Sequence, residues 1–377
     1  MLHTQRFYNQ AMLLEGIYAA VPTPFYFDER VYFRKLEANI ARYSRTLLSG
    51  VLLLGTNGEA PLLDDAETRD VLRVAAEAAA PEKVLIVGVG RESVKATVAL
   101  AEAAAQFRYD VVLVRTPTYY ASQMTAAAVL HYFRSVADRS PLPVLIYNIP
   151  RCVPYNIPVE LVAELAQHPN IFGIKDSSGS VERIRALVAQ TSAAPRRTVT
   201  VTPVFEAVTG RMLSPRAGNG DALISIGGVI DSDGKQYGIE SHPSDKDKNV
   251  ARVGHPELMK TRTKEIGFQV LTGSAGTLLE SLEAGASGAI LGFAACAPQA
   301  CQEVYFAWKD HDLKLAKEKQ ERIAAVSQRI VGQLGISGVK HACDFNGYYG
   351  GRARAPLLPV TGAEKAEIEG LLAGIRN

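Results

Sequence analysis

The most regular feature of the chain is a series of short apolar runs that alternate with longer amphipathic stretches. The runs are four to six residues long and rich in Val, Ile and Leu. Because they are apolar at consecutive positions, each predicts a parallel strand buried on both faces. The first six lie at 16–21, 51–54, 84–87, 111–114, 144–147 and 171–175.

Stretches with helical spacing, most of them rich in Ala, separate the runs. They lie at 34–48, 65–80, 93–107, 126–138 and 158–167. The pattern resumes with runs at 268–271 and 288–292, followed by helical stretches at 277–284 and 298–309. Unbroken alternation predicts a parallel sheet, and eight strand–helix units is the number that closes a barrel.

A doubly wound sheet is the competing α/β architecture. It usually has a Gly-rich turn after its first strand, whereas this chain has Val21-Pro-Thr-Pro-Phe25 there. We therefore predict an α/β protein with a (β/α)8 TIM barrel.

Two regions do not follow the alternation of apolar runs and helical stretches. Residues 193–267, rich in Gly, Ser, Pro and charge, form an insertion between strands 6 and 7, and an Asp-Gly pair between apolar runs at 222–230 and 235–239 predicts a hairpin in it. After residue 310 the chain continues as helices at about 311–334 and 362–376. We expect a barrel over 1–310, interrupted by the insertion, and a C-terminal helical region over 311–377.

The role of the insertion has two interpretations. A solvated surface excursion costs little closure entropy. A lid or a subunit contact is the alternative, because we expect the insertion to emerge beside the loop after strand 6, at the end of a barrel where catalytic groups gather.

Charge and composition exclude several partners. The 377 residues carry 41 Lys+Arg against 39 Asp+Glu, which argues against nucleic acid. No apolar run approaches the ~20 residues that span a bilayer, and the opening MLHTQRFYNQ lacks a secretory pattern, so we expect a cytoplasmic protein without membrane contact. The scattered cysteines indicate neither a metal site nor a disulfide framework. They are Cys152, Cys296, Cys301 and Cys343.

Candidate chemistry lies at the strand ends, because reactive groups of parallel barrels gather there. Lys175 ends the sixth run; in an apolar barrel mouth its amine would be neutral and nucleophilic, although a strand-end lysine can also simply reach solvent. Tyr147 ends the fifth run and could relay protons or merely pack. Gly-rich turns at 55–59 and 273–276 offer backbone N–H groups to a carboxylate or phosphate, but each is weak alone.

Four motifs in this order resemble the pyruvate-dependent class I aldolase family that includes dihydrodipicolinate synthase and N-acetylneuraminate lyase. They are GTNGE (55–59), TPTYY (116–120), YNIP (147–150) and GIKDSSG (173–179). Within this family the chain is most similar to 4-hydroxy-2-oxoglutarate aldolases. That similarity extends through QHPNI (167–171), FQVLTGSAG (268–276) and GYYGGRARAPL (347–357).

The resemblance implies catalytic roles for four residues. Lys175 would form the Schiff base with pyruvate, and Tyr147 would shuttle protons over the imine. Thr56 would join a hydroxyl relay with Tyr147 and Tyr120, the latter reaching in from a neighbouring subunit. A homo-oligomer, dimer or tetramer, is therefore expected, with no cofactor.

The resemblance also implies a substrate site. Thr56, Asn57 and nearby backbone N–H groups would hold the pyruvate carboxylate, and Ser177 and Gly273 would contact the rest of the substrate. Dihydrodipicolinate synthase has an arginine two residues after the proline of its YN-x-P motif, where this chain has Cys152, with Arg151 one place early. Arg151 is thus a candidate ligand for the second substrate's carboxylate.

We therefore expect reversible cleavage of 4-hydroxy-2-oxoglutarate to pyruvate and glyoxylate. The alternatives are condensation of pyruvate with aspartate semialdehyde, as in dihydrodipicolinate synthase, or a related 2-oxo-3-deoxy acid aldolase or dehydratase. A barrel that binds a 2-oxo acid without turnover is disfavoured, because the lysine and both tyrosines are present.

Overall fold

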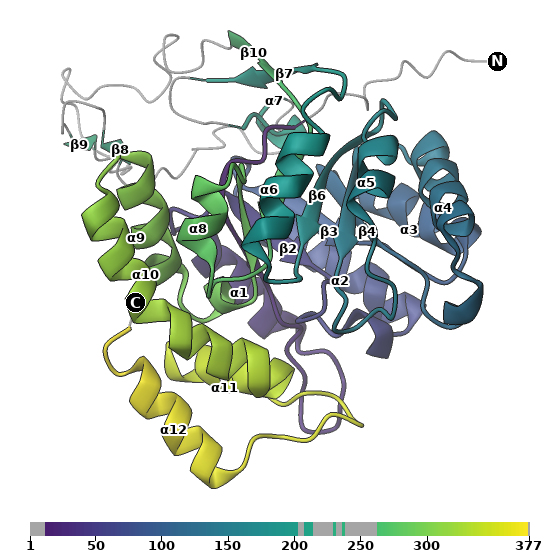
Figure 1. The fold of residues 1–377 in the computed structure, drawn as a ribbon. Coiled ribbons are helices and arrows are strands. Elements are labelled where there is room, and N and C mark those ends of the chain that lie inside the picture. Colours follow the sequence, from purple (N-terminus) through teal and green to yellow (C-terminus); the bar gives the residue numbers. More distant parts are fainter. Residues whose placement is uncertain (1–11, 203–206, 214–228, 231–235, 238–261, 376–377) are drawn as a thin grey trace, which may run out of the picture.

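The computed structural model describes residues 12–202, 207–213, 229–230, 236–237 and 262–375. Eight parallel strands close into a barrel in the order β1-β12-β11-β6-β5-β4-β3-β2 (Figure 1). They are β1 (Gly16–Ala20), β2 (Gly50–Leu53), β3 (Val84–Gly88), β4 (Val111–Arg115), β5 (Val144–Asn148), β6 (Ile171–Asp176), β11 (Gln269–Thr272) and β12 (Gly288–Leu291). The predicted (β/α)8 TIM barrel is confirmed.

Helices surround the barrel and cover the outer face of its sheet. They are α1 (Phe33–Ser44), α2 (Asp65–Ala78), α3 (Val94–Gln106), α4 (Ala126–Arg139), α5 (Val159–Leu165), α6 (Val181–Gln190), α8 (Leu278–Glu283) and α9 (Pro298–Lys309). Short 3-10 turns lie at Ala60–Leu62, Ala121–Gln123 and Phe293–Ala295. With helices outside and side chains filling the barrel inside, both strand faces are buried, which explains their continuous apolar runs.

Side-chain caps begin several of these helices. The side chains of Ser93, Thr125 and Ser180 accept hydrogen bonds from the backbone N–H groups three residues later. Asp64 and Glu67 form a reciprocal capping box at the start of α2. These caps satisfy N–H groups that have no partner inside the helix.

The C-terminal region shares the core of the barrel. It comprises α10 (Leu313–Ser327), a π-helical turn (Gln328–Gln333), α11 (Gly335–Phe345) and α12 (Gly362–Leu372). Ile323, Val339 and Ile368 belong to the same buried apolar cluster as the barrel helices. In Figure 1, α11 and α12 lie at one end of the barrel.

The insertion begins at the opposite end from the one expected. Helix α6 follows β6 after a short loop and returns the chain to the amino-terminal ends of the strands before the insertion starts. The expectation that the insertion emerges beside the catalytic loops is therefore wrong. Its cause is α6 (Val181–Gln190), a helix that was not predicted.

The described ends of the insertion form a small sheet and one helical turn. Strand β7 (Arg197–Val201) pairs antiparallel with β10 (Arg262–Ile266), and α7 spans Gly210–Leu213. Val199, Val201 and Ile266 pack with Leu13, just before β1. Figure 1 shows β7, β10 and α7 together at the end of the barrel away from α11 and α12.

Two arginines anchor these parts to the barrel. Arg197 donates to the carbonyl oxygen of Ile171, the first residue of β6, at 2.7 Å. Arg211 donates to the Asp110 carboxylate at 3.1 Å and to the carbonyl oxygen of Lys83, next to the starts of β4 and β3. Both contacts lie at the amino-terminal ends of the strands.

The hairpin predicted from the Asp-Gly pair is found in part. Val229–Ile230 (β8) pairs antiparallel with Gln236–Tyr237 (β9). Residues 222–228, 231–235 and 238–239 of the prediction lie outside the described residues.

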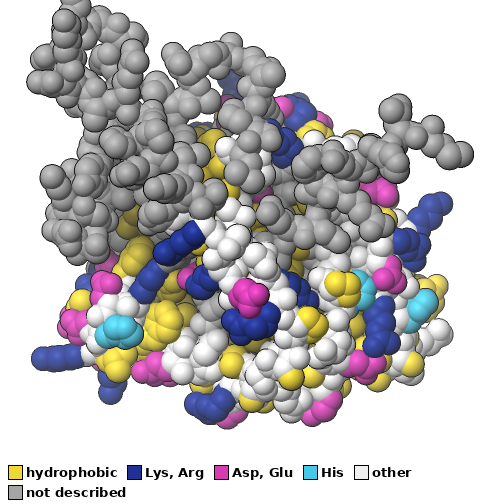
Figure 2. All heavy atoms as spheres, turned by 90° about the horizontal axis from the view of Figure 1, so that it is seen from above, with side chains coloured by type: hydrophobic (Ala, Val, Ile, Leu, Met, Phe, Trp, Pro, Cys, Tyr) yellow, Lys and Arg dark blue, Asp and Glu magenta, His cyan; other side chains and the backbone are white. Residues whose placement is uncertain are grey.

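None of the helices in the described ranges is both long and apolar enough to cross a membrane. On the face drawn in Figure 2, Lys and Arg side chains are interspersed with Asp and Glu side chains. This distribution agrees with the near-balance of charges in the sequence.

The anchoring of the insertion can be tested at Arg211. Arg211→Met should lower the free energy of unfolding by about 3–5 kcal/mol, because the buried Asp110 carboxylate loses its cation. Arg196→Met is the control, since its ion pair with Glu265 is exposed, and about 0–1 kcal/mol is expected. Urea denaturation measures both, and equal losses in the two variants would contradict the anchor. Catalytic rates should not change, because the contact lies at the end of the barrel opposite the site.

Candidate active site

Lys175 and Tyr147 lie side by side at the carboxyl ends of two neighbouring strands. They are register partners in the β5–β6 pair, so their side chains point to the same face of the sheet. The Lys175 Nζ lies 4.5 Å from the centroid of the Tyr147 ring. Only 4% of Lys175 is exposed. The two strand-end residues singled out in the sequence thus share one buried site.

The amino group of Lys175 lacks an acidic partner. Within the described part of the chain it forms no ion pair, and the next residue, Asp176, bonds to Asn148 and Arg183 instead. Desolvation by burial lowers the pKa of Lys175 to about 7, against a smaller opposing effect from Cys152. A large fraction of the amine is therefore neutral near pH 7, as a nucleophile requires.

The hydroxyl of Tyr147 is linked to Thr56. The Thr56 Oγ1 lies 3.2 Å from the Tyr147 hydroxyl oxygen. Burial raises the pKa of Tyr147 to about 12, although hydrogen bonds with Thr56 and Ser177 favour ionisation. At neutral pH the phenol is protonated, so its hydroxyl can donate one hydrogen bond and accept another, and it can take a proton on one side while it passes its own to Thr56 on the other.

Asn57 ties the loop 55–59 to the barrel. Its amide Nδ2 donates to the carbonyl oxygen of Ala20 at 3.0 Å and to that of Gly292 at 3.4 Å. These contacts use the side-chain donors that the sequence suggested for a substrate carboxylate. Among the residues described, the backbone N–H groups of Thr56 and Asn57 have no acceptor. They are donors available to an anion.

Ser177 and Gly273 meet at the ends of β6 and β11. A Cβ atom at Gly273 would lie 2.0 Å from the Ser177 Oγ, so only glycine leaves room for the serine side chain. The backbone N–H of Ser177 donates to the carbonyl oxygen of Asn148 at 2.9 Å. Gly273 thus shapes the site sterically, and Ser177 reaches the Tyr147 hydroxyl.

Arg151 and Tyr120 lie at the exposed edge of the site. Both side chains are exposed, Tyr120 by 59%. The Tyr120 ring stands edge-on to Tyr119 at 5.1 Å, and in the described chain it forms no hydrogen bond with Thr56 or Tyr147. Within a single chain, Tyr120 is therefore not hydrogen-bonded to the hydroxyl pair of Thr56 and Tyr147.

Glu92, which the sequence did not single out, holds the loop that carries Tyr120. Its carboxylate accepts from the backbone N–H groups of Thr118 and Tyr119 and pairs with Arg115 at 2.9 Å. Partial burial opposes its ionisation, but these bonds outweigh that effect and lower the pKa of Glu92 to about 2. The loop position is thus fixed by a charge on the preceding βα loop.

A second polar cluster, also missed, lies behind the reactive residues. Asn148 donates to Asp176 at 2.8 Å, and Arg183 donates to the same carboxylate oxygen at 2.7 Å. Asn148 also accepts from the backbone N–H of Ile157. The sequence contained a signal for this cluster, because the polar residues Asn148 and Asp176 directly follow Tyr147 and Lys175 at the strand ends. The cluster fixes the ends of β5 and β6 against each other.

Metal ligands do not gather in this part of the molecule. Across the described ranges, no group of three His, Cys, Asp or Glu side chains has an arrangement that could hold a metal ion.

Comparison with known proteins places this site in a family. A model of the dihydrodipicolinate synthetase family matches residues 13–196 and 251–374. A 4-hydroxy-tetrahydrodipicolinate synthase of Acidiphilium cryptum is 26% identical over 96% of this chain and 99% of its own length. A probable mitochondrial 4-hydroxy-2-oxoglutarate aldolase of Emericella nidulans is 37% identical, but over 47% of this chain and 59% of its own.

Solved structures show the same fold. YagE, a prophage protein of the dihydrodipicolinic acid synthase family from E. coli K12 solved in complex with pyruvate, has a TM-score of 0.72 at 22% identity, covering 96% of this chain and 99% of that one. The family model accounts for most of the chain and omits residues 197–250 of the insertion. The chain therefore belongs to the dihydrodipicolinate synthetase family of class I lyases and aldolases.

Proposed function

We propose that this protein is a Schiff-base-forming aldolase acting on 2-oxo acids, with Lys175 as the residue that forms the imine. The observation that carries the proposal is the buried Lys175 amine, which has a pKa of about 7 and no ion-pair partner among the described residues. About half of such an amine is neutral at pH 7, against roughly one part in 3,000 for an ordinary lysine. The site thus supplies a nucleophile without a metal.

The reaction begins with attack of the Lys175 Nζ on the C2 carbonyl of a 4-hydroxy-2-oxo acid. Loss of water gives a protonated imine, which draws electrons from the C3–C4 bond. As that bond breaks, the Tyr147 hydroxyl takes the C4 hydroxyl proton while it passes its own proton to the Thr56 hydroxyl, and an aldehyde leaves. The resulting enamine takes a proton at C3, and water then hydrolyses the imine to release pyruvate and the free amine.

The carboxylate of the substrate fits beside the loop 55–59. The free backbone N–H groups of Thr56 and Asn57 supply donors, and the Thr56 hydroxyl lies next to the proton-accepting phenol. Ser177 also hydrogen-bonds with Tyr147, and Gly273 leaves room for its side chain. A carboxylate held there presents C2 to Lys175 in one orientation.

The preferred substrate in this proposal is 4-hydroxy-2-oxoglutarate, cleaved to pyruvate and glyoxylate. Support comes from Cys152, which stands where dihydrodipicolinate synthase has its arginine, and from the exposed position of Arg151. Condensation with aspartate semialdehyde is the alternative, and relatives carrying each name match the chain. Aldol or dehydratase chemistry on a 2-oxo-3-deoxy acid would use the same imine.

The proposal includes a homo-oligomer, either a dimer or a tetramer. Tyr120 is exposed, yet its loop is held by the Glu92 carboxylate, so the ring projects from a fixed base. A neighbouring copy would receive Tyr120 beside Thr56 and Tyr147 and complete the three-hydroxyl relay.

Covalent trapping tests the imine. Borohydride reduction in the presence of pyruvate should add a pyruvate-derived mass to the peptide that contains Lys175, and Lys175→Arg should abolish both the adduct and turnover. Peptide mass mapping locates the adduct. The peptide that contains Lys340, a second buried lysine, is the internal control and should carry no adduct in any sample. An adduct on another lysine, or none in the wild type, would contradict the mechanism.

The pH dependence tests the state of Lys175. Because burial lowers its pKa to about 7, the protonated, unreactive amine predominates below that pH and the neutral amine above it. We expect kcat/KM to rise about tenfold per pH unit below 7 and to level off above it. Initial rates of pyruvate release between pH 5.5 and 9 measure the profile. A rate that keeps rising toward pH 10 would mean an unperturbed lysine.

A panel of acceptors tests the substrate. With pyruvate as donor, kcat/KM should be higher for glyoxylate than for aspartate semialdehyde or for a sugar-derived aldehyde, the acceptor that would give a 2-oxo-3-deoxy acid. Cys152→Arg should shift this ratio toward aspartate semialdehyde by about tenfold, because a guanidinium pairs with a carboxylate in a bidentate geometry. Arg151→Gln serves as the comparison for loss of a nearby charge. A wild-type preference for aspartate semialdehyde would support the alternative.

A further inference from the structure

A buried ion pair connects the loop 55–59 to the C-terminal region. The Glu59 carboxylate and the Lys340 ammonium, on α11, lie 2.5 Å apart. Glu59 is 1% exposed and Lys340 is fully buried. Two charges removed from water in this way stay stable only while each has its partner.

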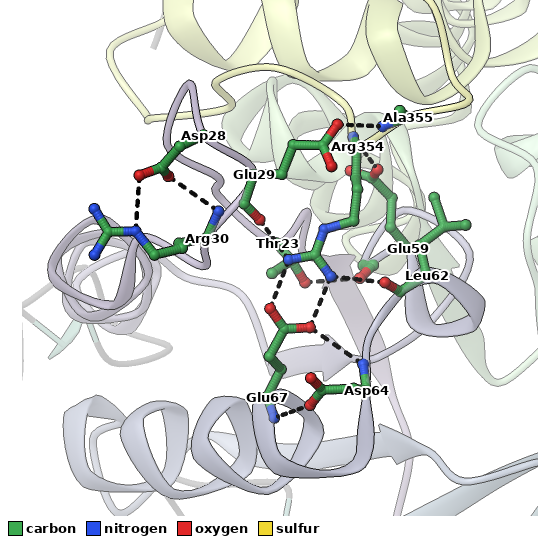
Figure 3. Close-up of polar contacts among 11 residues, drawn as sticks. Thr23, Asp28, Glu29, Arg30, Glu59, Leu62, Asp64, Glu67, Arg354 and Ala355 are labelled. Carbon is green, nitrogen blue, oxygen red and sulfur yellow. Dashed lines mark hydrogen bonds and ion pairs between the residues drawn. The ribbon is translucent and has the colours of Figure 1, made fainter.

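The chain between α11 and α12 closes over this pair. The backbone N–H of Arg354 donates to the other Glu59 oxygen at 2.8 Å, and Lys340 donates to the carbonyl oxygen of Arg352 at 2.6 Å. The Phe25 ring lies 4.4 Å from the Lys340 Nζ and 4.3 Å from the Arg354 guanidinium. Glu59 therefore has contacts with both α11 and the segment that follows it. Figure 3 shows its contact with Arg354 in that segment.

Arg354, in the segment between α11 and α12, also contacts the chain that leads from this loop into α2. The Arg354 guanidinium forms a bidentate pair with Glu67, at 2.7 and 2.6 Å, and donates to the carbonyl oxygen of Leu62 at 2.7 Å. Glu67 in turn belongs to the capping box of α2 with Asp64. Figure 3 shows these groups converging on Arg354. The stretch from Glu59 to Glu67 is thus held at both ends by the C-terminal region.

Glu59 is coupled to Thr56 through the backbone. Its N–H donates to the carbonyl oxygen of Thr56 at 3.1 Å, and Thr23 donates to the carbonyl oxygen of Gly58 at 2.7 Å. Glu59 has φ +53°, a left-handed conformation that is unfavourable for a residue with a side chain. Contacts of its carboxylate hold that conformation in place, and Thr56 is three residues away.

We propose that Glu59 and Lys340 are positioning residues, which hold Thr56 at hydrogen-bonding distance from Tyr147. The proposal rests on the proposed function, because Thr56 matters only if Tyr147 moves protons for an imine on Lys175. Neither member of the pair contacts the substrate. Without Lys340, the Glu59 carboxylate turns toward water and carries the loop with it.

A double-mutant cycle tests this role. Lys340→Met should lower kcat about 10- to 100-fold in the wild-type background and change KM by less than about threefold. In a Thr56→Val background it should lower kcat by no more than about twofold, because the relay that it positions is already lost. An equal fall in kcat in both backgrounds, or no fall in the wild type, would overturn the proposal.

A charge-free pair separates positioning from stability. Glu59→Gln with Lys340→Met leaves no unpaired charge, so thermal stability should recover relative to Lys340→Met while kcat stays low. Recovery of kcat together with stability would show that the ion pair is not needed for positioning. Arg329→Met is the matched control: it breaks an ion pair with Glu367 in the same C-terminal region, away from the loop, and should leave kcat unchanged.

Failure of this proposal and failure of the proposed function have different outcomes. Borohydride trapping of pyruvate on wild-type Lys175 reports on the function alone. An adduct in the wild type with unchanged kcat in Lys340→Met overturns the positioning role and leaves the aldolase in place. Absence of the adduct overturns the function itself.

Discussion

The burial of Lys175 with no acidic partner among the described residues is the constraint on which the proposed chemistry depends. The chain contains a second deeply buried lysine, and the contrast between the two is informative. Lys340 has Glu59 at 2.5 Å and a carbonyl oxygen at 2.6 Å, so its environment provides compensation for a charge. Lys175 faces an aromatic ring and a hydroxyl pair instead. Burial lowers the pKa of both lysines, but Glu59 opposes that effect at Lys340, whereas Lys175 has no ion-pair partner among the described residues.

The geometry of a β-strand keeps the Asp176 carboxylate away from the Lys175 amine. Successive residues of a strand point to opposite faces, so the Tyr147 and Lys175 side chains lie on one face while Asn148 and Asp176 lie on the other. Arg183 neutralises Asp176 there at 2.7 Å. A carboxylate directly after the lysine would otherwise favour its protonated form. The alternation of side chains along the strand keeps Lys175 apart from Asp176. It also places the cluster of Asn148, Asp176 and Arg183 on the opposite face, where it fixes the strand ends that carry Tyr147 and Lys175.

Local patterns predicted the barrel and the pair Lys175 and Tyr147, because strands buried on both faces are apolar throughout and polar residues at their ends stand out. Contacts between distant segments could not be predicted in this way. Nothing near Glu59 indicates that its partner is Lys340, on a helix that contains two glycines and was not predicted. Nothing near Asn57 indicates that its side-chain amide donates to the ends of β1 and β12, because that contact is set by barrel closure.

The two ends of the barrel differ in what they tolerate. The family model passes over residues 197–250, and the described ends of that insertion contact the amino-terminal ends of the strands through Arg211 and Arg197. Additions at this end leave the loops around Lys175 in place, because contacts there affect stability and not the geometry of the site. The C-terminal region lies at the other end, and its segment 352–354 contacts Glu59 directly. Residues of α11 and the segment after it are therefore constrained by the loop that holds Thr56, whereas the anchoring contacts of Arg197 and Arg211 lie at the other end of the strands.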